Sequence, residues 1–141
     1  MKINWTTIGL TFAGGALGTL FRIGADYGIN QLVGTSLGEL LGLLVVNTLG
    51  AGVIGWLNGD PRMTSNGRRA FWGVGFAGGF TTMSGIALFL LLSAGFDPIA
   101  IAIAAGMFGL GFVAYWASHT LTSRLTGNFQ AVSHDVEEIS E

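Results

Sequence analysis

Uncharged polar side chains in apolar surroundings are the residues of this sequence that could do chemistry. Asn47 lies in the middle of residues 40–59, which contain no Lys, Arg, Asp or Glu, and Ala51, Gly55 and Asn58 follow it on one helical face. A carboxamide there can donate two N–H groups to an anion without carrying a charge itself. It could instead form a hydrogen bond between two helices, and the spacing leaves both interpretations open.

A second polar stretch, GGFTTMSG at residues 78–85, lies within residues 70–96, which are also uncharged. Its three glycines weaken a helix, and the hydroxyls of Thr81, Thr82 and Ser84 compete for backbone hydrogen bonds. The composition therefore predicts an interruption of a helix. Backbone groups released away from water need protein or an ion as partners, so the stretch is either an ion site or a kink used for packing.

Motifs of the common enzyme classes are missing from the sequence. The two histidines, His119 and His134, stand alone, and no Ser-His-Asp set, zinc-binding HExxH motif or Walker loop can be assembled. The chain has no cysteine, which excludes disulfides and thiolate metal ligands. We therefore expect the protein not to be an enzyme.

The elements that must position these residues are long apolar segments. Only 10% of the residues are charged, against about 25% in soluble domains. Uncharged runs cover residues 3–21, 40–59, 70–96 and 98–123, and each approaches or exceeds the roughly 18–20 residues that span a bilayer as a helix. We expect an all-α membrane protein with four transmembrane helices, at about residues 5–29, 37–58, 69–94 and 98–121.

The predicted organisation is one transmembrane domain, residues 1–121, followed by a polar acidic tail, residues 122–141. Glycines with GxxxG spacing occur in several of the helices, as at Gly14 and Gly18 or Gly75 and Gly79. Such small residues let membrane helices approach closely. The spacing alone fits packing within one subunit and packing between subunits.

Basic residues are concentrated on one predicted side of the membrane. With four spans, the N-terminus, the loop at residues 58–69 and the C-terminus share one side, whereas the loops of the other side hold no Lys or Arg. The positive-inside rule therefore predicts a multi-pass protein of the cell membrane with both termini in the cytoplasm. The basic residues of that side are Lys2, Arg62, Arg68, Arg69 and Arg124.

Three stretches together resemble the Fluc (CrcB) family of small fluoride-specific ion channels. They are GGALGTLFR at residues 14–22, LLVVNTLGAGVIG at residues 43–55 and GFAGGFTTMSG at residues 75–85, and they follow the order that the family has. The four-helix plan with a broken third helix covers about residues 5–121. The resemblance implies a passive channel that exports fluoride and lowers its cytoplasmic concentration.

The same resemblance implies an assembly and ion positions. It implies an antiparallel dimer with two narrow fluoride pathways along the subunit interface. It also implies a structural sodium ion (Na+), not transported, held at the dimer centre by the backbone carbonyls of Gly78 and Thr81. A buried cation would offset part of the desolvation cost of a small anion. The residues that the resemblance assigns to the fluoride pathway are Asn47, Thr82, Ser84 and Arg22.

The chain departs from the family at two pathway positions. Met83 and Ile86 stand where the family has phenylalanines, whose electropositive ring edges face the ion. We expect both side chains to line the pathway, although neither can supply an aromatic edge. The one-sided basic residues should also fix a single orientation, so the antiparallel partner is expected to be a second homologous subunit, otherwise the chain itself.

Two other functions fit parts of the sequence. A non-conducting structural subunit of a heterodimeric fluoride channel is favoured by the missing phenylalanines, whereas Asn47 and the intact stretch at residues 78–84 oppose it. A small multidrug exporter of the four-helix antiparallel type needs a carboxylate in its first helix, and residues 3–21 contain none.

Overall fold

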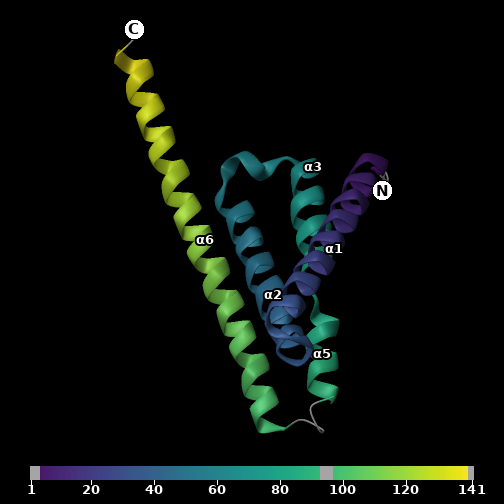
Figure 1. The fold of residues 1–141 in the computed structure, drawn as a ribbon. Helices are drawn as coiled ribbons and strands as arrows, with labels where there is room; N and C mark the ends of the chain where they lie inside the picture. The colour runs from purple at the N-terminus through teal and green to yellow at the C-terminus, as the bar shows by residue number, and fades with distance from the viewer. Residues whose placement is uncertain (1–3, 93–96, 140–141) are drawn as a thin grey trace.

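The structure, a computed structural model, describes residues 4–92 and 97–139, without the side chains of residues 35–37 and 128–139. Within this part of the chain, four helical segments are long and apolar enough to cross a membrane: Trp5–Val33, Gly38–Gly59, Asn66–Leu92 and Pro98–Gly127. The predicted all-α membrane fold with four transmembrane helices is thereby confirmed. Figure 1 shows that the chain passes up and down, so that both termini and the segment after α2 lie at the same end.

The first two helices meet at a single residue. Helix α1 (Trp5–Val33) begins after Asn4, whose side chain accepts a hydrogen bond from the Thr7 N–H at 3.2 Å, and α2 (Thr35–Gly59) follows directly. Gly34 joins them with a φ of +84°, a left-handed backbone that glycine adopts without steric cost. Its N–H donates to the Asn30 carbonyl at 3.0 Å, which closes α1. Helix α1 therefore ends four residues after the predicted residue 29, whereas the start of α2 lies within two residues of the predicted residue 37.

The segment between the second and third spans is ordered by local hydrogen bonds. It contains η1, a 3-10 helix (Pro61–Thr64), and leads into the short α3 (Asn66–Arg68), which opens the third span. The Asp60 carboxylate accepts a hydrogen bond from the Arg62 N–H at 2.8 Å, and proline follows at the first helical position, where its missing N–H costs nothing. The third span thus begins at residue 66 instead of the predicted residue 69.

After α3, the third span continues in three further helical pieces. A π-helix, η2 (Arg69–Ala77), continues into α4 (Gly78–Phe80), and α5 (Met83–Leu92) follows. Residues 81–82 are not helical, and Thr81 has extended dihedral angles, φ −79° and ψ 161°. The change of direction between the upper and lower halves of this span is visible in Figure 1.

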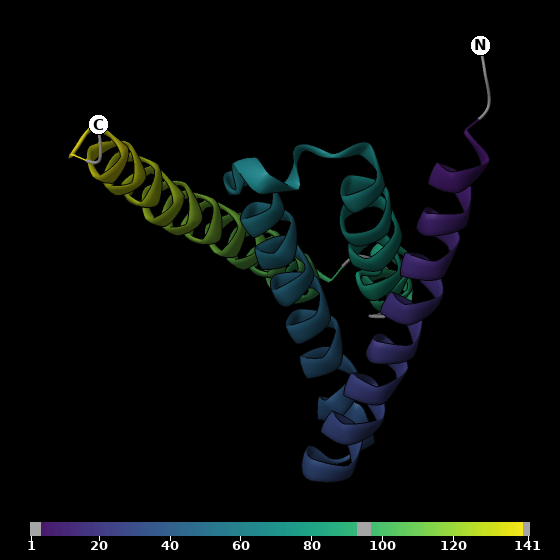
Figure 2. The same cartoon turned by 90° about the horizontal axis from the view of Figure 1, so that it is seen from above.

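The last helix, α6 (Pro98–Ile139), is longer than predicted. Its 42 residues correspond to about 63 Å, roughly twice the hydrocarbon thickness of a bilayer. The start at Pro98 agrees with the sequence, but the predicted end at residue 121 is wrong. No proline interrupts the second half, and the hydroxyls of Thr122 and Thr126 bond to carbonyls one turn earlier within the helix. Figures 1 and 2 show the C-terminal part of α6 extending away from the other helices.

Glycines let the helices of one subunit touch backbone to backbone. A Cβ atom at Gly14 or Gly18 of α1 would collide with backbone atoms of the third span, and one at Gly75 or Gly79 would collide with α1. Gly55 of α2 lies in the same way against the backbone of α6. Most of the GxxxG pairs are therefore used inside the subunit. Gly24 and Gly28, by contrast, have nothing within 4 Å of the Cβ position.

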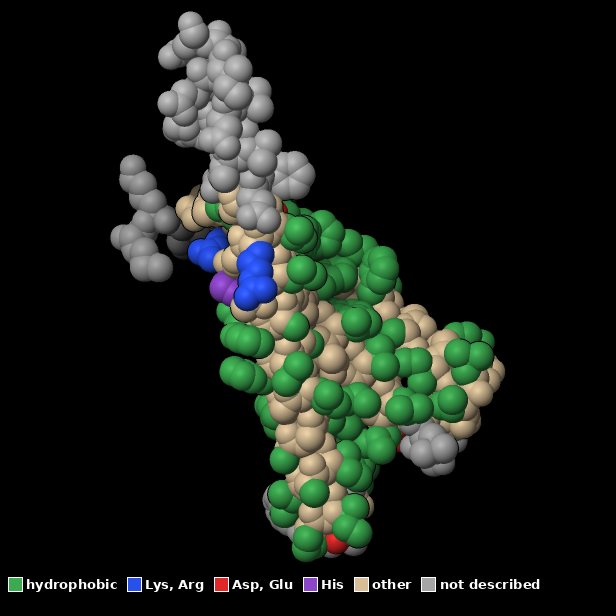
Figure 3. Space-filling model, turned by 90° about the vertical axis from the view of Figure 1, so that its left-hand side faces the viewer, with side chains coloured by type: hydrophobic (Ala, Val, Ile, Leu, Met, Phe, Trp, Pro, Cys, Tyr) green, Lys and Arg blue, Asp and Glu red, His purple; other side chains and the backbone are tan. Residues whose placement is uncertain are grey.

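The core of the isolated subunit is small, and its surface is apolar. Buried Ile86, Ala104 and Met107 form a cluster between α5 and α6, with Leu43 of α2 packed against it. Large side chains such as Leu32, 85% exposed, and Phe12, 79% exposed, point outward. Figure 3 shows apolar side chains along the length of one face of the molecule, with basic and histidine side chains near one end. Such a surface requires lipid or another chain to cover it.

Candidate functional site

Asn47 bridges the interruption of the third span. Its Oδ1 accepts a hydrogen bond from the Thr82 N–H at 2.9 Å, and its Nδ2 donates to the Thr82 carbonyl at 3.3 Å and to the Leu43 carbonyl at 2.9 Å. The carboxamide thus pairs with the backbone of Thr82 as an adjacent strand would. Both amide hydrogens have protein acceptors, so the interhelical hydrogen bond proposed for Asn47 is present in this conformation.

Thr82 also begins the helix that follows the interruption. Its Oγ1 accepts a hydrogen bond from the Gly85 N–H at 3.0 Å, the contact of an N-cap residue, and lies 3.1 Å from the Ser84 Oγ. One residue therefore has its backbone held by α2 while its side chain caps α5. Ser84 is exposed and reaches this arrangement only through Thr82.

Two backbone carbonyls lose their helical partners at the interruption. In a continuous helix the N–H groups of Thr82 and Gly85 would bond to the carbonyls of Gly78 and Thr81. Both N–H groups donate to side-chain oxygens instead, those of Asn47 and Thr82. Gly78 is exposed, and a Cβ atom there would meet nothing within 4 Å. Carbonyl oxygens without such partners are the ligands that a hard cation takes, so Gly78 and Thr81 fit the sodium expectation in their chemistry.

A groove of about 320 Å³ runs beside the interruption, between α2, the third span and α6. This groove is lined both by residues that the sequence analysis singled out and by aromatic residues of α6. Met83 is 64% exposed, whereas Ile86 is only 4% exposed and packs toward Ala104 and Met107. The residues that line the groove include Asn47, Thr81, Met83, Ile86, Phe108, Phe112 and Tyr115.

Two of the aromatic residues of α6, Phe108 and Phe112, were missed by sequence reasoning. Phe108, Phe112 and Tyr115 follow one another at intervals of four and three residues, which places them on one face of a helix. That spacing was the available signal. In an apolar span it does not distinguish a groove-lining face from a lipid-facing one.

Arg22 does not line this groove. It lies on α1 one turn before Asp26, and the two side chains attract each other electrostatically. The structure therefore brings Asn47, Thr81, Thr82 and Met83 to one place, and leaves Arg22 outside it within a single subunit.

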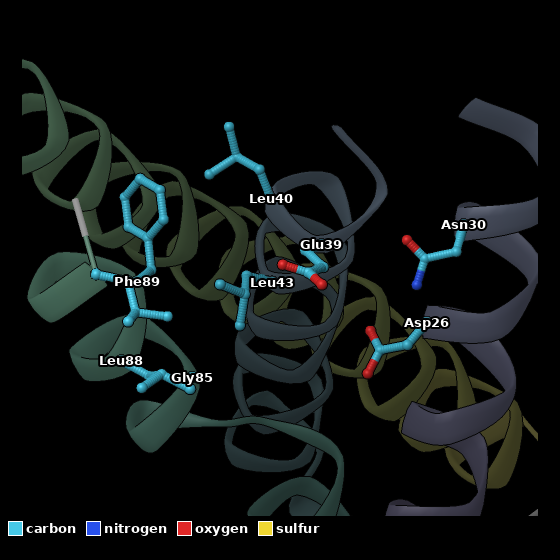
Figure 4. A pocket seen from close by; sticks show the side chains of 9 residues that line it. Asp26, Asn30, Glu39, Leu40, Leu43, Gly85, Leu88 and Phe89 are labelled. Atoms are coloured by element: carbon cyan, nitrogen blue, oxygen red, sulfur yellow. The ribbon is translucent and has the colours of Figure 1, made fainter. Parts of the chain in front are cut away.

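A second cavity, of about 450 Å³, lies between α1, α2 and α5 and carries acidic groups. Figure 4 shows Asp26 and Asn30 of α1 on one side of it and the apolar Leu88 and Phe89 of α5 on the other, with Glu39 and Leu43 of α2 between them. Two carboxylates disfavour an anion here. In the described part of the chain, no three His, Cys, Asp or Glu residues converge as metal ligands. The groove beside Asn47 is thus the better candidate for an anion.

Comparison with known protein families decides the classification. The family model described as CrcB-like protein, Camphor Resistance (CrcB), matches residues 9–119. This chain belongs to the CrcB family. The matched range holds all three stretches on which the resemblance was based, and it ends within α6 before the extension beyond residue 121.

Individual relatives agree with membership of the CrcB family. A protein of Gloeobacter violaceus named fluoride-specific ion channel FluC is 34% identical over 125 residues, covering 82% of this chain and 95% of its own length. One of Corynebacterium jeikeium named fluoride-specific ion channel FluC 2 is 38% identical over 96 residues. That match spans only 56% of the relative's length. No solved structure matches the chain significantly.

CrcB relatives are named as ion channels. Membership of this family confirms the prediction that the chain is not an enzyme.

Proposed function

We propose that this chain is a subunit of a fluoride-specific passive channel that exports fluoride and lowers its cytoplasmic concentration. The observation that carries the proposal is the interruption of the third span at residues 81–82. Asn47 forms hydrogen bonds with its backbone, and a groove runs beside it. The names of the relatives from Gloeobacter and Corynebacterium support fluoride as the ion.

The groove supports a pathway that a second subunit completes. Met83 is 64% exposed, and the rest of the subunit surface is largely apolar, so the groove has an open side. In the proposed antiparallel dimer, a homologous chain of opposite charge bias closes that side. The names FluC 1 and FluC 2, borne by relatives in two Corynebacterium species, are consistent with more than one such protein in an organism.

The Asn47 carboxamide has two roles in this proposal. It holds the backbone of Thr82 in place, and its N–H groups are donors on the wall of the groove that could turn to a passing anion. A small anion such as fluoride loses a strong hydration shell on entry, so donors along the wall must replace part of that water. Thr82 and Ser84 would supply hydroxyl groups beside the same point, and Met83 and Ile86 would form the apolar wall.

Arg22 contributes to the proposed pathway only across a subunit boundary, because it does not reach the groove of its own chain. In this proposal the chain lies in the cell membrane, and the positive-inside rule places both termini in the cytoplasm.

Sodium has a chemically suitable position in the proposed dimer. The carbonyls of Gly78 and Thr81 would hold it, and the ion would supply fixed positive charge near the fluoride pathways. We expect exchange of sodium for N-methylglucamine during purification to lower the melting temperature of the detergent-solubilised channel, with recovery on adding sodium back. A melting temperature that is independent of the cation would contradict sodium binding.

The experiment that tests the proposed function is fluoride efflux from liposomes, with chloride efflux as control. Fluoride-selective efflux from the chain alone would show that it pairs with itself. Efflux only after addition of an opposite-facing homologue would establish a heterodimer. Absence of fluoride-selective efflux in both preparations would reject a conducting role.

A structural, non-conducting subunit is the second candidate. The use of both Asn47 amide hydrogens within the subunit and the buried position of Ile86 favour it. The multidrug exporter remains the weaker alternative. Asp26 does lie within α1, but the family match and the names of the relatives favour a channel.

A further inference from the structure

Three polar side chains from three different elements are linked at one end of the groove. The Arg69 Nη2, at the start of η2, donates to the Asn58 Oδ1 at 3.4 Å. The Asn58 Nδ2, near the end of α2, donates to the Tyr115 Oη of α6 at 3.3 Å. None of these contacts belongs to the Asn47 arrangement, which lies 11 residues earlier in α2, about 16 Å along the helix axis.

The chemistry of Arg69 determines the direction of both hydrogen bonds. A guanidinium group only donates, so the Asn58 carboxamide must turn its oxygen toward Arg69 and its NH₂ group toward Tyr115. The Tyr115 oxygen is then an acceptor, and its own O–H hydrogen is left to donate elsewhere. The described residues provide no acceptor for that O–H.

Tyr115 lines the groove, and its surroundings suit an anion. Between it and Asn47 the walls are apolar, formed by Ala51, Ile54 and Phe112, so its hydroxyl is the polar group at this end. The His119 ring stacks on the Tyr115 ring with centroids 6.0 Å apart. Figure 3 shows basic and histidine side chains gathered near one end of the molecule. The positive charge of these basic side chains attracts anions to the end of the groove where the Tyr115 O–H has no protein acceptor in the described part of the chain.

We propose that the Tyr115 hydroxyl is an anion-binding donor at the terminus-side end of the groove, with fluoride as its ligand and Asn58 and Arg69 as positioning residues. The inference rests on the proposed fluoride channel and adds to it a second polar point, separated from Asn47 by an apolar stretch. Fluoride is the small anion that accepts the strongest hydrogen bond from a neutral O–H group, so this donor favours it over chloride.

The chain has only two tyrosines, Tyr27 and Tyr115, which makes a direct binding experiment possible. The full chain, labelled with [ζ-¹³C]tyrosine and reconstituted in nanodiscs with its partner if one is required, should give two ring signals. Tyr115→Phe and Tyr27→Phe assign them. Sodium fluoride, titrated against sodium chloride at constant ionic strength, is expected to shift the Tyr115 signal saturably and to leave the signal of exposed Tyr27 unchanged. Equal shifts with chloride, or no fluoride-dependent shift of Tyr115, would overturn the proposal.

Two further variants separate positioning from a general structural effect. Asn58→Leu removes the donor to Tyr115, and we expect the fluoride affinity read from the Tyr115 signal to weaken roughly threefold to tenfold. Arg69→Gln keeps a donor to Asn58 without the charge, and it should retain more of the affinity than Arg69→Leu. Unchanged affinity in both Asn58→Leu and Arg69→Leu would show that neither residue positions Tyr115.

Flux measurements distinguish this inference from the proposed function. In liposomes, Tyr115→Phe should slow fluoride efflux roughly threefold to tenfold, whereas Tyr27→Phe should match the unmodified chain. Normal efflux in Tyr115→Phe would reject the inference while the channel function stands. A saturable Tyr115 shift without efflux from the unmodified assembly would keep the anion site and reject conduction.

Discussion

At the scale of the residue, the interruption of the third span is stabilised by side chains that replace the backbone hydrogen-bond partners of a continuous helix. Asn47 pairs with both polar groups of the Thr82 backbone, and the Thr82 hydroxyl caps the helix that starts after it. These contacts satisfy the groups that an interrupted helix exposes at membrane depth. They also release the carbonyls of Gly78 and Thr81. The same contacts that stabilise the interruption therefore leave free the two carbonyls to which the proposed function assigns sodium.

Asn47→Asp tests the carboxamide. A carboxylate can still accept from the Thr82 N–H, but it cannot donate to the Leu43 and Thr82 carbonyls. We expect a loss of stability of about 1–3 kcal/mol from two lost hydrogen bonds, and at least tenfold slower fluoride efflux because the added charge repels the anion. Chemical denaturation and liposome efflux of the assembled channel measure the two effects. Nearly unchanged flux would support the structural-subunit alternative.

Thr82→Val tests the cap of α5. Valine keeps the shape of threonine but cannot accept a hydrogen bond from the Gly85 N–H, and loss of such a cap costs about 0.5–2 kcal/mol. We expect a lower melting temperature and faster hydrogen exchange at the amide of Gly85. Thr82→Ser, which retains the hydroxyl, is the matched control and should behave like the unmodified chain. Equal exchange rates in the two variants would contradict the capping role.

At the scale of the element, close backbone contact depends on glycine faces that oppose each other. Gly14 and Gly18 of α1 meet the third span where Gly75 and Gly79 lie, and Gly55 admits the backbone of α6. Lipid offers no hydrophobic gain for bringing helices together, so this contact area is what holds them in register. The interruption at residues 81–82 follows directly after the last of these glycine contacts.

Gly18→Ala is expected to separate α1 from the third span. A Cβ atom there would collide with the Phe76 carbonyl and lie 2.9 Å from the Phe80 backbone nitrogen. We expect a destabilisation of about 1–3 kcal/mol, measured by unfolding in detergent. Gly9→Ala is the matched control in the same helix, because its Cβ would meet nothing within 4 Å. A control that destabilises as much as Gly18→Ala would argue against packing as the cause.

At the scale of the whole molecule, the distribution of charge and the apolar surface together predict how the chain is oriented in the membrane. Arg62, Arg68, Arg69 and Arg124 are exposed at the end that carries the termini, while the helical surfaces between the two ends are largely apolar. An apolar body with basic residues at one end should insert in a single orientation. A chain with one orientation needs an oppositely oriented homologue for an antiparallel dimer.

Cysteine labelling tests this orientation, since the natural chain contains no cysteine. Ser65→Cys places a thiol at the end with the termini, and Leu32→Cys places one at the opposite end, where Leu32 is 85% exposed. In intact cells, a membrane-impermeant maleimide should label Leu32→Cys and not Ser65→Cys. Labelling of both variants to the same extent would show dual insertion and would remove the argument for a separate partner.

The number and type of the spans follow from the sequence, as do the start of α6 at Pro98 and the one-sided distribution of basic residues. These features depend on composition and on neighbours within one helical turn, which are local properties. Helix ends were less predictable. The single residue Gly34 both ends α1 and starts α2, so the joint is shorter than the loop that the sequence suggested. Helix α6 continues beyond residue 121 because no proline or other strong local signal there outweighs the propagation of an established helix.

Only the tertiary structure decided how the candidate site is assembled. Asn47 and Thr82 are 35 residues apart, and no spacing rule indicates that a carboxamide of one helix meets the backbone of another. Met83 and Ile86 looked equivalent in sequence, and their spacing places them on the same side of α5. Ala104 and Met107 of α6 nevertheless pack against Ile86 and leave Met83 64% exposed, a difference that depends only on where α6 meets α5. The pairing of Tyr115 with Asn58 and Arg69 likewise exists only because α2, α6 and η2 converge at one end.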